Sequence, residues 1–337
     1  MKRRVLIVYA GGTIGMQPSD QGYIPMKGFH KQLDSFLRAR GLKHLPHFDI
    51  IECQELIDSS NILPNNWTAL CQLLLQHWEE YDGFVLLHGT DTMAYTASML
   101  SFMLQGTNKP VILTGSQIPM MQARSDAYEN LITSVILAGS MHLPEVCILF
   151  ANRLLRGNRS SKLKTAGFDA FDSPNFPWLG NIGITIDLQH HLLLNPKAQS
   201  FLTPSFDQDA VALLQTYPGI SAEVLKAVIN RPNVKGLVLQ TYGAGNPPDA
   251  NREFIETLEE ASERGVVILN ITQCTYGAVS QGTYATGAAL NRMGVVAGAD
   301  LTLEAAFTKL HFLLSQQLPI DKLKRALTTP LAGEMTV

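Results

Sequence analysis

Two hydroxyl groups and a carboxylate are packed into the stretch His88-Gly89-Thr90-Asp91-Thr92. The short apolar run of residues 83–88 precedes it, which suits a strand buried on both faces, and a run with helical spacing follows at residues 93–104. The stretch should therefore be a strand-to-helix turn at the carboxyl end of a strand, where open α/β sheets bind ligands. Thr and Asp are also preferred helix caps, so a purely structural role for Thr90 and Asp91 is the alternative.

Small polar residues follow other predicted strands in the same manner. The strands Val5–Tyr9, Asp49–Cys53 and Pro110–Thr114 each run into a turn that carries hydroxyl or carboxylate groups. Because the carboxyl ends of parallel strands share one edge of a sheet, these groups should lie together. The candidates collected in this way are Thr13, Asp58, Ser59, Ser60, Thr90, Asp91 and Ser116.

A threonine hydroxyl is a poor nucleophile until a base or a positive field assists it. Lys162 and Asp91 are the candidates for that assistance. A free lysine with a pKa of about 10.4 is protonated at pH 7, and a neighbouring Asp91 would favour that charged form. Lys162 also ends a run of four cations, residues 153–162, which taken alone predicts a solvated face. The residues by themselves leave the activating group open.

The elements that must position these groups alternate between strand and helix. Strands at residues 5–9, 49–53, 83–88, 110–114 and 145–150 are separated by predicted helices at 64–78, 93–104 and 126–139. This order predicts a parallel α/β sheet. Residues 16–25, with two prolines, and residues 169–183 are predicted as loops, and residues 184–194 as a strand pair.

The α/β order resumes after a predicted linker at residues 195–209. Strands are expected at 236–240 and 266–271, a capped helix at 251–264 and a long amphipathic helix at 301–317. The predicted organisation is a larger N-terminal domain, residues 1–194, and a smaller C-terminal α/β domain, residues 210–337.

Composition excludes several classes of protein. Apolar residues make up 46% and charged residues 16% of the chain, and the net charge is −3, so nucleic acid and anionic membrane are poor partners. The cysteines show no CxxC spacing, which argues against a disulfide framework or a zinc site. The apolar run Val5–Ala10 is too short for a signal peptide, so a cytoplasmic location is expected.

Two further sites are disfavoured by spacing. The glycine-rich stretch Ala10–Gly15 lacks the first glycine of a dinucleotide fingerprint and leads into a predicted loop rather than a helix. His190 and His191 are adjacent and do not share a helix face, so no metal site is expected. His88 lies within its strand and is interpreted as a core histidine.

Five motifs in this order resemble the bacterial L-asparaginase family, and its cytoplasmic type I branch in particular. They are Gly11-Gly-Thr-Ile-Gly15, His88-Gly-Thr-Asp-Thr92, Thr114-Gly-Ser116, Arg156-Gly-Asn-Arg159 with Lys162, and Tyr242-Gly-Ala-Gly-Asn246. The resemblance covers nearly the whole chain. It implies a two-domain asparaginase-like α/β fold and an amidohydrolase that makes L-aspartate and ammonia from L-asparagine without a cofactor.

The resemblance also implies roles for single residues. Thr13 would attack the substrate amide and form a β-aspartyl ester, helped by Tyr23 in a lid of about residues 13–28. Thr90, Asp91 and Lys162 would form a second catalytic group.

Substrate binding is implied by the same motifs. Asp58 and Asp91 would hold the substrate ammonium. Ser59 and nearby backbone amides would hold its carboxylate. Ser60, Thr90 and Ser116 would also bind the substrate. Asn246 would come from a second subunit, which requires a homodimer or homotetramer.

Some type I relatives carry a regulatory asparagine site, which would align with Ser161, Gln240 and Cys274. Gln240 stands where an arginine would be expected to hold the effector carboxylate, which predicts weak or absent regulation. Two alternatives to a free asparaginase remain. One is the amidase subunit of a tRNA-dependent amidotransferase, which should carry a domain before the first strand, where only Met1–Arg4 stand here. The other is a non-catalytic amino-acid-binding module.

Overall fold

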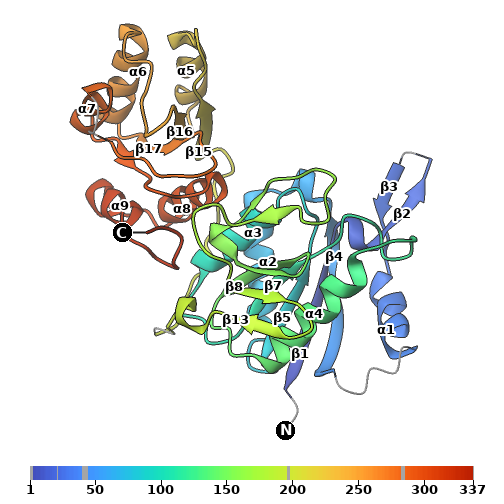
Figure 1. The fold of residues 1–337 in the computed structure, drawn as a ribbon. Coiled ribbons are helices and arrows are strands. Elements are labelled where there is room, and N and C mark those ends of the chain that lie inside the picture. The colour runs from blue at the N-terminus through green and yellow to red at the C-terminus, as the bar shows by residue number, and fades with distance from the viewer. Residues whose placement is uncertain (1–2, 21, 40–44, 196–197, 282–284, 337) are drawn as a thin grey trace. The chain divides into compact units, whose positions relative to one another are not determined.

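The first strand, β1 (Arg4–Gly11), lies inside an eight-stranded sheet of order β13-β12-β9-β8-β7-β5-β1-β4 (Figure 1). The computed structural model describes residues 3–20, 22–39, 45–195, 198–281 and 285–336. The ends of the chain, residue 21 of the predicted lid and residues 196–197 of the predicted linker lie outside the described residues. The chain forms two compact units, Met1–Thr203 and Pro204–Val337.

Parallel pairing organises one side of the sheet in the first unit, from β8 to the edge strand β4. The parallel strands are β1, β4 (His47–Ile57), β5 (Gly83–Leu87), β7 (Val111–Thr114) and β8 (Val146–Phe150). Antiparallel pairing then adds β9 (Arg153–Arg156), β12 (Gly180–Ile182) and β13 (Ile186–Leu188). The predicted α/β class is confirmed, with an antiparallel edge that the prediction of a parallel sheet did not include.

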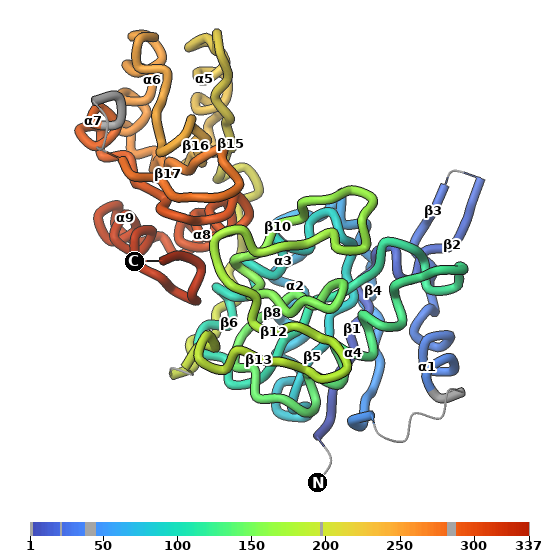
Figure 2. The backbone as a smooth tube through the Cα atoms, in the orientation of Figure 1, coloured from blue at the N-terminus to red at the C-terminus, as the bar shows by residue number. Residues whose placement is uncertain are grey.

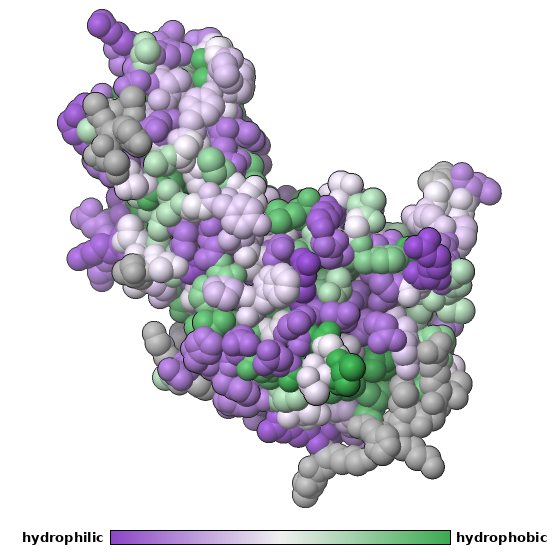
Figure 3. All heavy atoms as spheres, in the orientation of Figure 1, coloured by the Kyte–Doolittle hydropathy of each residue, from purple (hydrophilic) through white to green (hydrophobic). Residues whose placement is uncertain are grey.

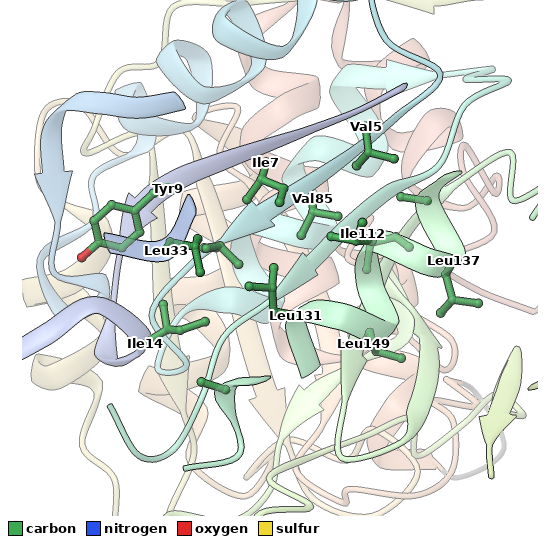
Figure 4. Close-up of a cluster of buried hydrophobic side chains, with 14 of the residues drawn as sticks. Val5, Ile7, Tyr9, Ile14, Leu33, Val85, Ile112, Leu131, Leu137 and Leu149 are labelled. Carbon is green, nitrogen blue, oxygen red and sulfur yellow. The ribbon is translucent and has the colours of Figure 1, made fainter. Parts of the chain in front are cut away.

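Helices cover both faces of this sheet, which is why its strands are apolar without alternation. Val5, Ile7 and Tyr9 of β1 pack into one core with Leu33 and Leu131 (Figure 4). These last two residues come from α1 (Phe29–Ala39) and α4 (Ala127–Ser140). On the other face, α3 (Met93–Met103) packs against β7 and β8, and α2 (Pro64–Gln76) packs against α3.

Two segments predicted as loops contain strands, so those predictions were wrong. The first segment, residues 16–25, contains β2 (Met16–Ser19) and β3 (Gly22–Pro25), which pair as an antiparallel hairpin that projects from the first unit in Figure 1. A two-stranded ribbon has two free edges, so prolines that would break a central strand are tolerated. Residues 169–183 contain β11 (Phe171–Asp172), which pairs with β10 (Ser161–Lys162), and β12, which pairs with β9 and β13.

The predicted strand pair at residues 184–194 is also wrong. Only β13 forms there, and it pairs with β12, while His190–Leu192 form a 3-10 turn, η4. Two short strands, β6 (Leu104–Gln105) and β14 (Ser200–Phe201), pair with each other.

The second unit is built on a four-stranded parallel sheet of order β15-β16-β17-β18. Its strands are β15 (Val211–Gln215), β16 (Gly236–Thr241), β17 (Val267–Thr272) and β18 (Val296–Ala297). Its helices are α5 (Ala222–Ile229), α6 (Arg252–Glu263), α7 (Ala285–Arg292), α8 (Leu303–Ser315) and α9 (Ile320–Leu327) (Figure 2).

Two helix predictions in this unit had different outcomes. Asn251 caps α6 as predicted, because its side chain accepts a hydrogen bond from Phe254 N at 3.1 Å. The prediction that α8 is amphipathic was wrong. The consecutive residues Leu310, His311, Phe312 and Leu313 are all buried. The partly exposed face of α8 also carries apolar side chains, those of Leu303, Phe307 and Leu314.

Hydrophilic residues cover most of the molecular face drawn in Figure 3. Large exposed apolar side chains such as Met121 and Ile184 lie in turns of the first unit. Within the described part of the chain, no helix is both long and apolar enough to span a membrane.

Candidate active site

Three turns meet at the carboxyl edge of the large sheet, around β1. The chain leaves β1 for β4 on one side and later returns to β5 on the other, so β1 and β5 flank a topological switch point. A β-carbon on Gly12 would lie 2.3 Å from Gly89 N, and one on Gly89 would lie 2.3 Å from Ser59 Oγ. The turns after β1, β4 and β5 are therefore in direct contact, with no side chain between Gly12 and Gly89.

Thr13 begins η1 (Thr13–Gly15), a short 3-10 turn, and its side chain is half-buried. Two contacts support this turn from below. The buried Tyr9 hydroxyl donates to Gly15 O at 3.2 Å, and Met120 N donates to Ile14 O at 3.0 Å. Burial raises the pKa of Tyr9, so the phenol stays neutral and keeps its donor proton. The turn that presents Thr13 is thus fixed from the sheet side.

Thr90 is nearly buried and contacts Lys162. Lys162 Nζ lies 2.7 Å from Thr90 Oγ1 and 2.7 Å from Asp91 Oδ1. Lys162 is presented by β10 (Ser161–Lys162), which pairs with β11. The structure therefore brings together the three residues that the sequence singled out as a second catalytic group.

The cationic run of residues 153–162 is not a solvated face, so that prediction was wrong. Arg156 and Arg159 are buried, and both guanidinium groups lie over the ring of Phe176, at 4.4 and 5.1 Å from its centre. Arg156 Nε also pairs with Glu145 Oε2 at 2.6 Å. The burial of these arginines depends on Glu145, directly before β8, and on Phe176, in the loop between β11 and β12. Within this group, Lys162 is the cation that contacts Thr90.

The predicted substrate-binding residues occupy the same edge. Asp58 caps the 3-10 turn η2 (Ser59–Asn61) by accepting from Ser60 N at 3.1 Å. Ser59 is buried and Ser60 is exposed. Ser116 is buried, and its hydroxyl donates to Ile118 O at 2.7 Å, so it has only lone pairs left to offer a ligand.

Tyr23 lies on β3 of the hairpin, with half of its side chain exposed. Its hydroxyl accepts a hydrogen bond from Gln122 Nε2. The structure thus gives Tyr23 a partner outside the predicted catalytic group, on the segment between β7 and α4.

Sequence reasoning missed two glutamines beside this site. Gln117 Oε1 lies 3.5 Å from Thr90 Oγ1, while Gln117 Nε2 donates to Thr165 O and Gly167 O at 3.1 and 2.9 Å. Gln122 is the partner of Tyr23. The available signal for Gln117 was its position directly after Ser116; no comparable signal marked Gln122.

His88 is a satisfied core residue, as predicted. Its Nδ1 lies 2.8 Å from Gly89 O and its Nε2 lies 3.1 Å from Thr96 Oγ1. Complete burial lowers the pKa of His88 to about 4, so the imidazole is neutral at pH 7. Its neutral ring braces the turn that carries Thr90.

The remaining predicted residues are distributed over both units. Ser161 precedes Lys162 in the first unit. In the second unit, Gln240 lies on β16, Asn246 lies in the turn after β16, and Cys274 is exposed beyond β17. Among the residues that the structure describes, no cluster of His, Cys, Asp or Glu is arranged to hold a metal ion.

Comparisons with known proteins address the identity of this arrangement. A family model described as "Asparaginase, N-terminal" matches residues 4–194, and one described as "Glutaminase/Asparaginase C-terminal domain" matches residues 210–327. The chain belongs to the asparaginase family. L-asparaginase 1 of Escherichia coli strain K12 is 45% identical over 339 residues, which cover 99% of this chain and 98% of that protein. The predicted resemblance to the type I branch of the family is confirmed.

Solved asparaginase structures agree with the fold. The crystal structure of L-asparaginase I from Vibrio cholerae has a TM-score of 0.91 and 42% identity, with 100% of both chains covered. The thermostable L-asparaginase from Thermococcus kodakarensis has a TM-score of 0.88 and 31% identity, with 99% of both chains covered. The two asparaginase family models correspond to β1 through η4 and to β15 through α9.

Proposed function

We propose that this amidohydrolase of the asparaginase family hydrolyses L-asparagine to L-aspartate and ammonia through a β-aspartyl ester on Thr13. The observation that carries the proposal is the pair of 2.7 Å contacts from Lys162 Nζ to Thr90 and Asp91. They are formed on a turn that touches the turn of Thr13. The alternative of a non-catalytic binding module is set aside because the chain belongs to a family of enzymes.

The proposed reaction has two steps. In the first, Thr13 Oγ1 bonds to the carboxamide carbon, and its proton passes to the amide nitrogen, which leaves as ammonia. In the second, water adds to the ester carbon, the carbon–Thr13 bond breaks, and a proton returns to Thr13 as L-aspartate leaves. Tyr23 assists the first proton transfer. The backbone amide of Thr90 stabilises the oxyanion of each step, which is typically worth about 3 kcal/mol.

The geometry around Thr90 supports its part in proton transfer. Its oxygen accepts from Lys162 Nζ, so its own proton remains to be donated. Its acceptor is Gln117 Oε1, which lies 3.5 Å from Thr90 Oγ1, at the long limit of a hydrogen bond. Thr90 can therefore exchange this contact for one with substrate or water, while Lys162 and Asp91 stabilise the charge that develops.

Substrate recognition follows from the charges of a free amino acid. Asp58 and Asp91 supply carboxylates for the α-ammonium group, and Ser59 and Ser60 supply hydroxyl groups near the α-carboxylate. Ser116 would donate to the substrate only by giving up its hydrogen bond to Ile118 O. L-glutamine is longer by one methylene, a difference that an apolar pocket discriminates by only about 1–3 kcal/mol. We expect L-glutamine to be a slower substrate of the same site.

The experiment is ammonia release from L-asparagine, D-asparagine and L-glutamine by purified Thr13→Ala and Thr90→Val. Each variant should lose at least about 10³-fold in turnover, because each removes a covalent or proton-transfer step. Thr107→Val is the matched control, since Thr107 is also buried but bonds to Lys109 O in the loop before β7. Activity of Thr13→Ala or Thr90→Val within tenfold of the wild type would remove that residue from the mechanism.

The ester is tested separately. Rapid denaturation of enzyme during turnover, followed by mass spectrometry of its peptides, should find an aspartyl adduct on the peptide that contains Thr13. An adduct confined to another residue, such as Thr90, would assign the nucleophile elsewhere.

We also propose that the enzyme is a cytoplasmic homodimer or homotetramer in which Asn246 completes the site of a second subunit. Cys53, Cys71, Cys147 and Cys274 are all free thiols, which is typical of a reducing compartment. Thr13→Ala subunits and Asn246→Ala subunits, dissociated and reassembled together, should be more active than either variant alone. Mixed oligomers no more active than the separate variants would contradict the sharing of sites.

A further inference from the structure

The turn after β16, residues 242–246, is fixed through its own backbone and by a neighbouring amide. Tyr242 O accepts from Gly245 N and Asn246 N at 3.0 and 2.8 Å, and Asn246 O accepts from Tyr242 N at 3.1 Å. Ser280 N donates to Ala244 O at 2.9 Å. These bonds leave two carbonyl groups of the turn, at positions 243 and 245, to be satisfied from elsewhere.

Two side chains of the adjacent strand β17 satisfy those carbonyl groups. Thr272 Oγ1 donates to Gly243 O at 2.6 Å, and Asn270 Nδ2 donates to Gly245 O at 3.0 Å. Every backbone carbonyl of the turn therefore accepts a hydrogen bond. A five-residue turn at the end of a strand needs far fewer bonds than this to reverse the chain.

Asn270 is an unusual residue for its position. It is fully buried in a strand that is otherwise largely aliphatic, where a polar group costs free energy unless it is hydrogen-bonded. Its Oδ1 accepts from Thr241 Oγ1 at 2.7 Å, and its Nδ2 also donates to Gln281 Oε1 at 3.2 Å. An aliphatic residue would serve the packing of β17, so the amide is present for the bonds it makes.

The backbone of the turn depends on this arrangement. Gly243 and Gly245 have φ values of +49° and +107°, a region that other residues rarely adopt. A β-carbon on Gly245 would lie 2.7 Å from Val279 Cγ1 and 3.0 Å from Asn270 Nδ2. The glycines allow the chain to reach β17 closely, and the side chains of β17 then hold it there.

We infer that Asn270 and Thr272 are positioning residues that hold Asn246 in the orientation needed to complete the active site of a second subunit. This inference rests on the proposed role of Asn246. Asn270 and Thr272 bond to the carbonyl groups on either side of the turn that carries Asn246, and this is the route by which they would affect catalysis. Thr272 Oγ1 also accepts from Cys274 N at 3.0 Å. A displacement of about 1 Å by a residue remote from the chemistry is enough to lower catalysis by up to about 10²-fold.

The first test is Thr272→Val, which removes the hydroxyl group and keeps the shape. Thr257→Val is the matched control in the same unit, because Thr257 is also buried and its hydroxyl donates to Glu253 O at 2.7 Å, within its own helix. Thr272→Val should lower kcat/KM for L-asparagine by about tenfold. Thr257→Val should change kcat/KM by less than about twofold, for a similar change in Tm.

The same substitutions in an Asn246→Ala background separate positioning from general stability. If Thr272 acts through Asn246, Thr272→Val should cause no more than about a twofold further loss there. An equal loss in both backgrounds would overturn the inference while leaving the role of Asn246 intact. Wild-type activity of Asn246→Ala itself would instead refute the proposed function of Asn246.

A second variant, Asn270→Asp, gives a readout that a merely structural role would not move. While protonated, the introduced carboxyl group can still donate to Gly245 O; once ionised, it repels that oxygen. The ratio of variant to wild-type kcat/KM should therefore fall by about tenfold as pH rises through its pKa, with the far-UV circular dichroism unchanged. A pH-independent ratio would overturn the inference. So would failure of both variants to fold, because the network would then be structural.

Discussion

Replacing Lys162 by methionine separates catalysis from stability, because it keeps an unbranched side chain of similar length and removes the charge. The side chain of Lys162 is 19% exposed and that of its partner Asp91 is 61% exposed. An ion pair with one partner so exposed contributes about 0–1 kcal/mol, so Tm should fall by no more than about 4 °C. The loss of a group that assists proton transfer should lower turnover by about 10³-fold, which corresponds to about 4 kcal/mol of barrier.

The assay is ammonia release at saturating L-asparagine, together with thermal unfolding of the same samples. Lys164→Met is the control, because Lys164 is two residues away on the same segment and pairs with an aspartate of its own, Asp169. That variant should keep its turnover within about twofold of the wild type. Turnover of Lys162→Met within tenfold of the wild type would refute the reasoning, as would a Tm loss large enough to account for inactivity by unfolding.

Three other predictions follow from a buried ion pair, from two buried histidines and from Gln240 at the predicted effector site. Arg156→Met strands the buried Glu145 without its partner and should lower the free energy of unfolding by about 3–5 kcal/mol in urea titrations, unlike Lys162→Met. Burial lowers the pKa of His88 and of His311 from 6.5 to about 4. Between these pKa values the unfolded chain therefore binds more protons than the folded chain. As the pH is lowered from 6.5 to 4, the free energy of unfolding should fall by about 1.4 kcal/mol per pH unit for each histidine, and His311→Asn should reduce that slope. With Gln240 at the predicted effector position, velocity against L-asparagine should be hyperbolic, and a sigmoidal curve would contradict this.

The strands that carry the site could be located from the sequence because they are buried on both faces. Continuous apolar runs predicted β5, β7 and β8 to within one residue at each end. The hairpin of residues 16–25 carries no such signal, because it projects from the sheet and its order comes from its own backbone pairing. β11 and β12 are too short to give an apolar run of their own, and they are defined by pairing with β10, β9 and β13.

Within the candidate site, the sequence could identify residues that follow strands but not contacts made across long separations. Gln122 meets Tyr23 across 99 positions of the chain, and Gln117 meets Gly167 across 50. Amide side chains occur throughout protein surfaces, so their spacing in the sequence does not predict which residues they contact. The burial of Arg156 could not be predicted either, because it depends on Glu145, directly before β8, and on Phe176 in the loop between β11 and β12.

The contact between Gly12, Gly89 and Ser59 has a consequence for directed evolution. A β-carbon at position 12 would lie 2.3 Å from Gly89 N, and one at position 89 would lie 2.3 Å from Ser59 Oγ, so only glycine fits at either position. Libraries that randomise these positions should return glycine, whatever substrate is selected. New substrate preference will have to be sought in the hairpin β2–β3 and in residues 117–122, which border the site without sharing that contact.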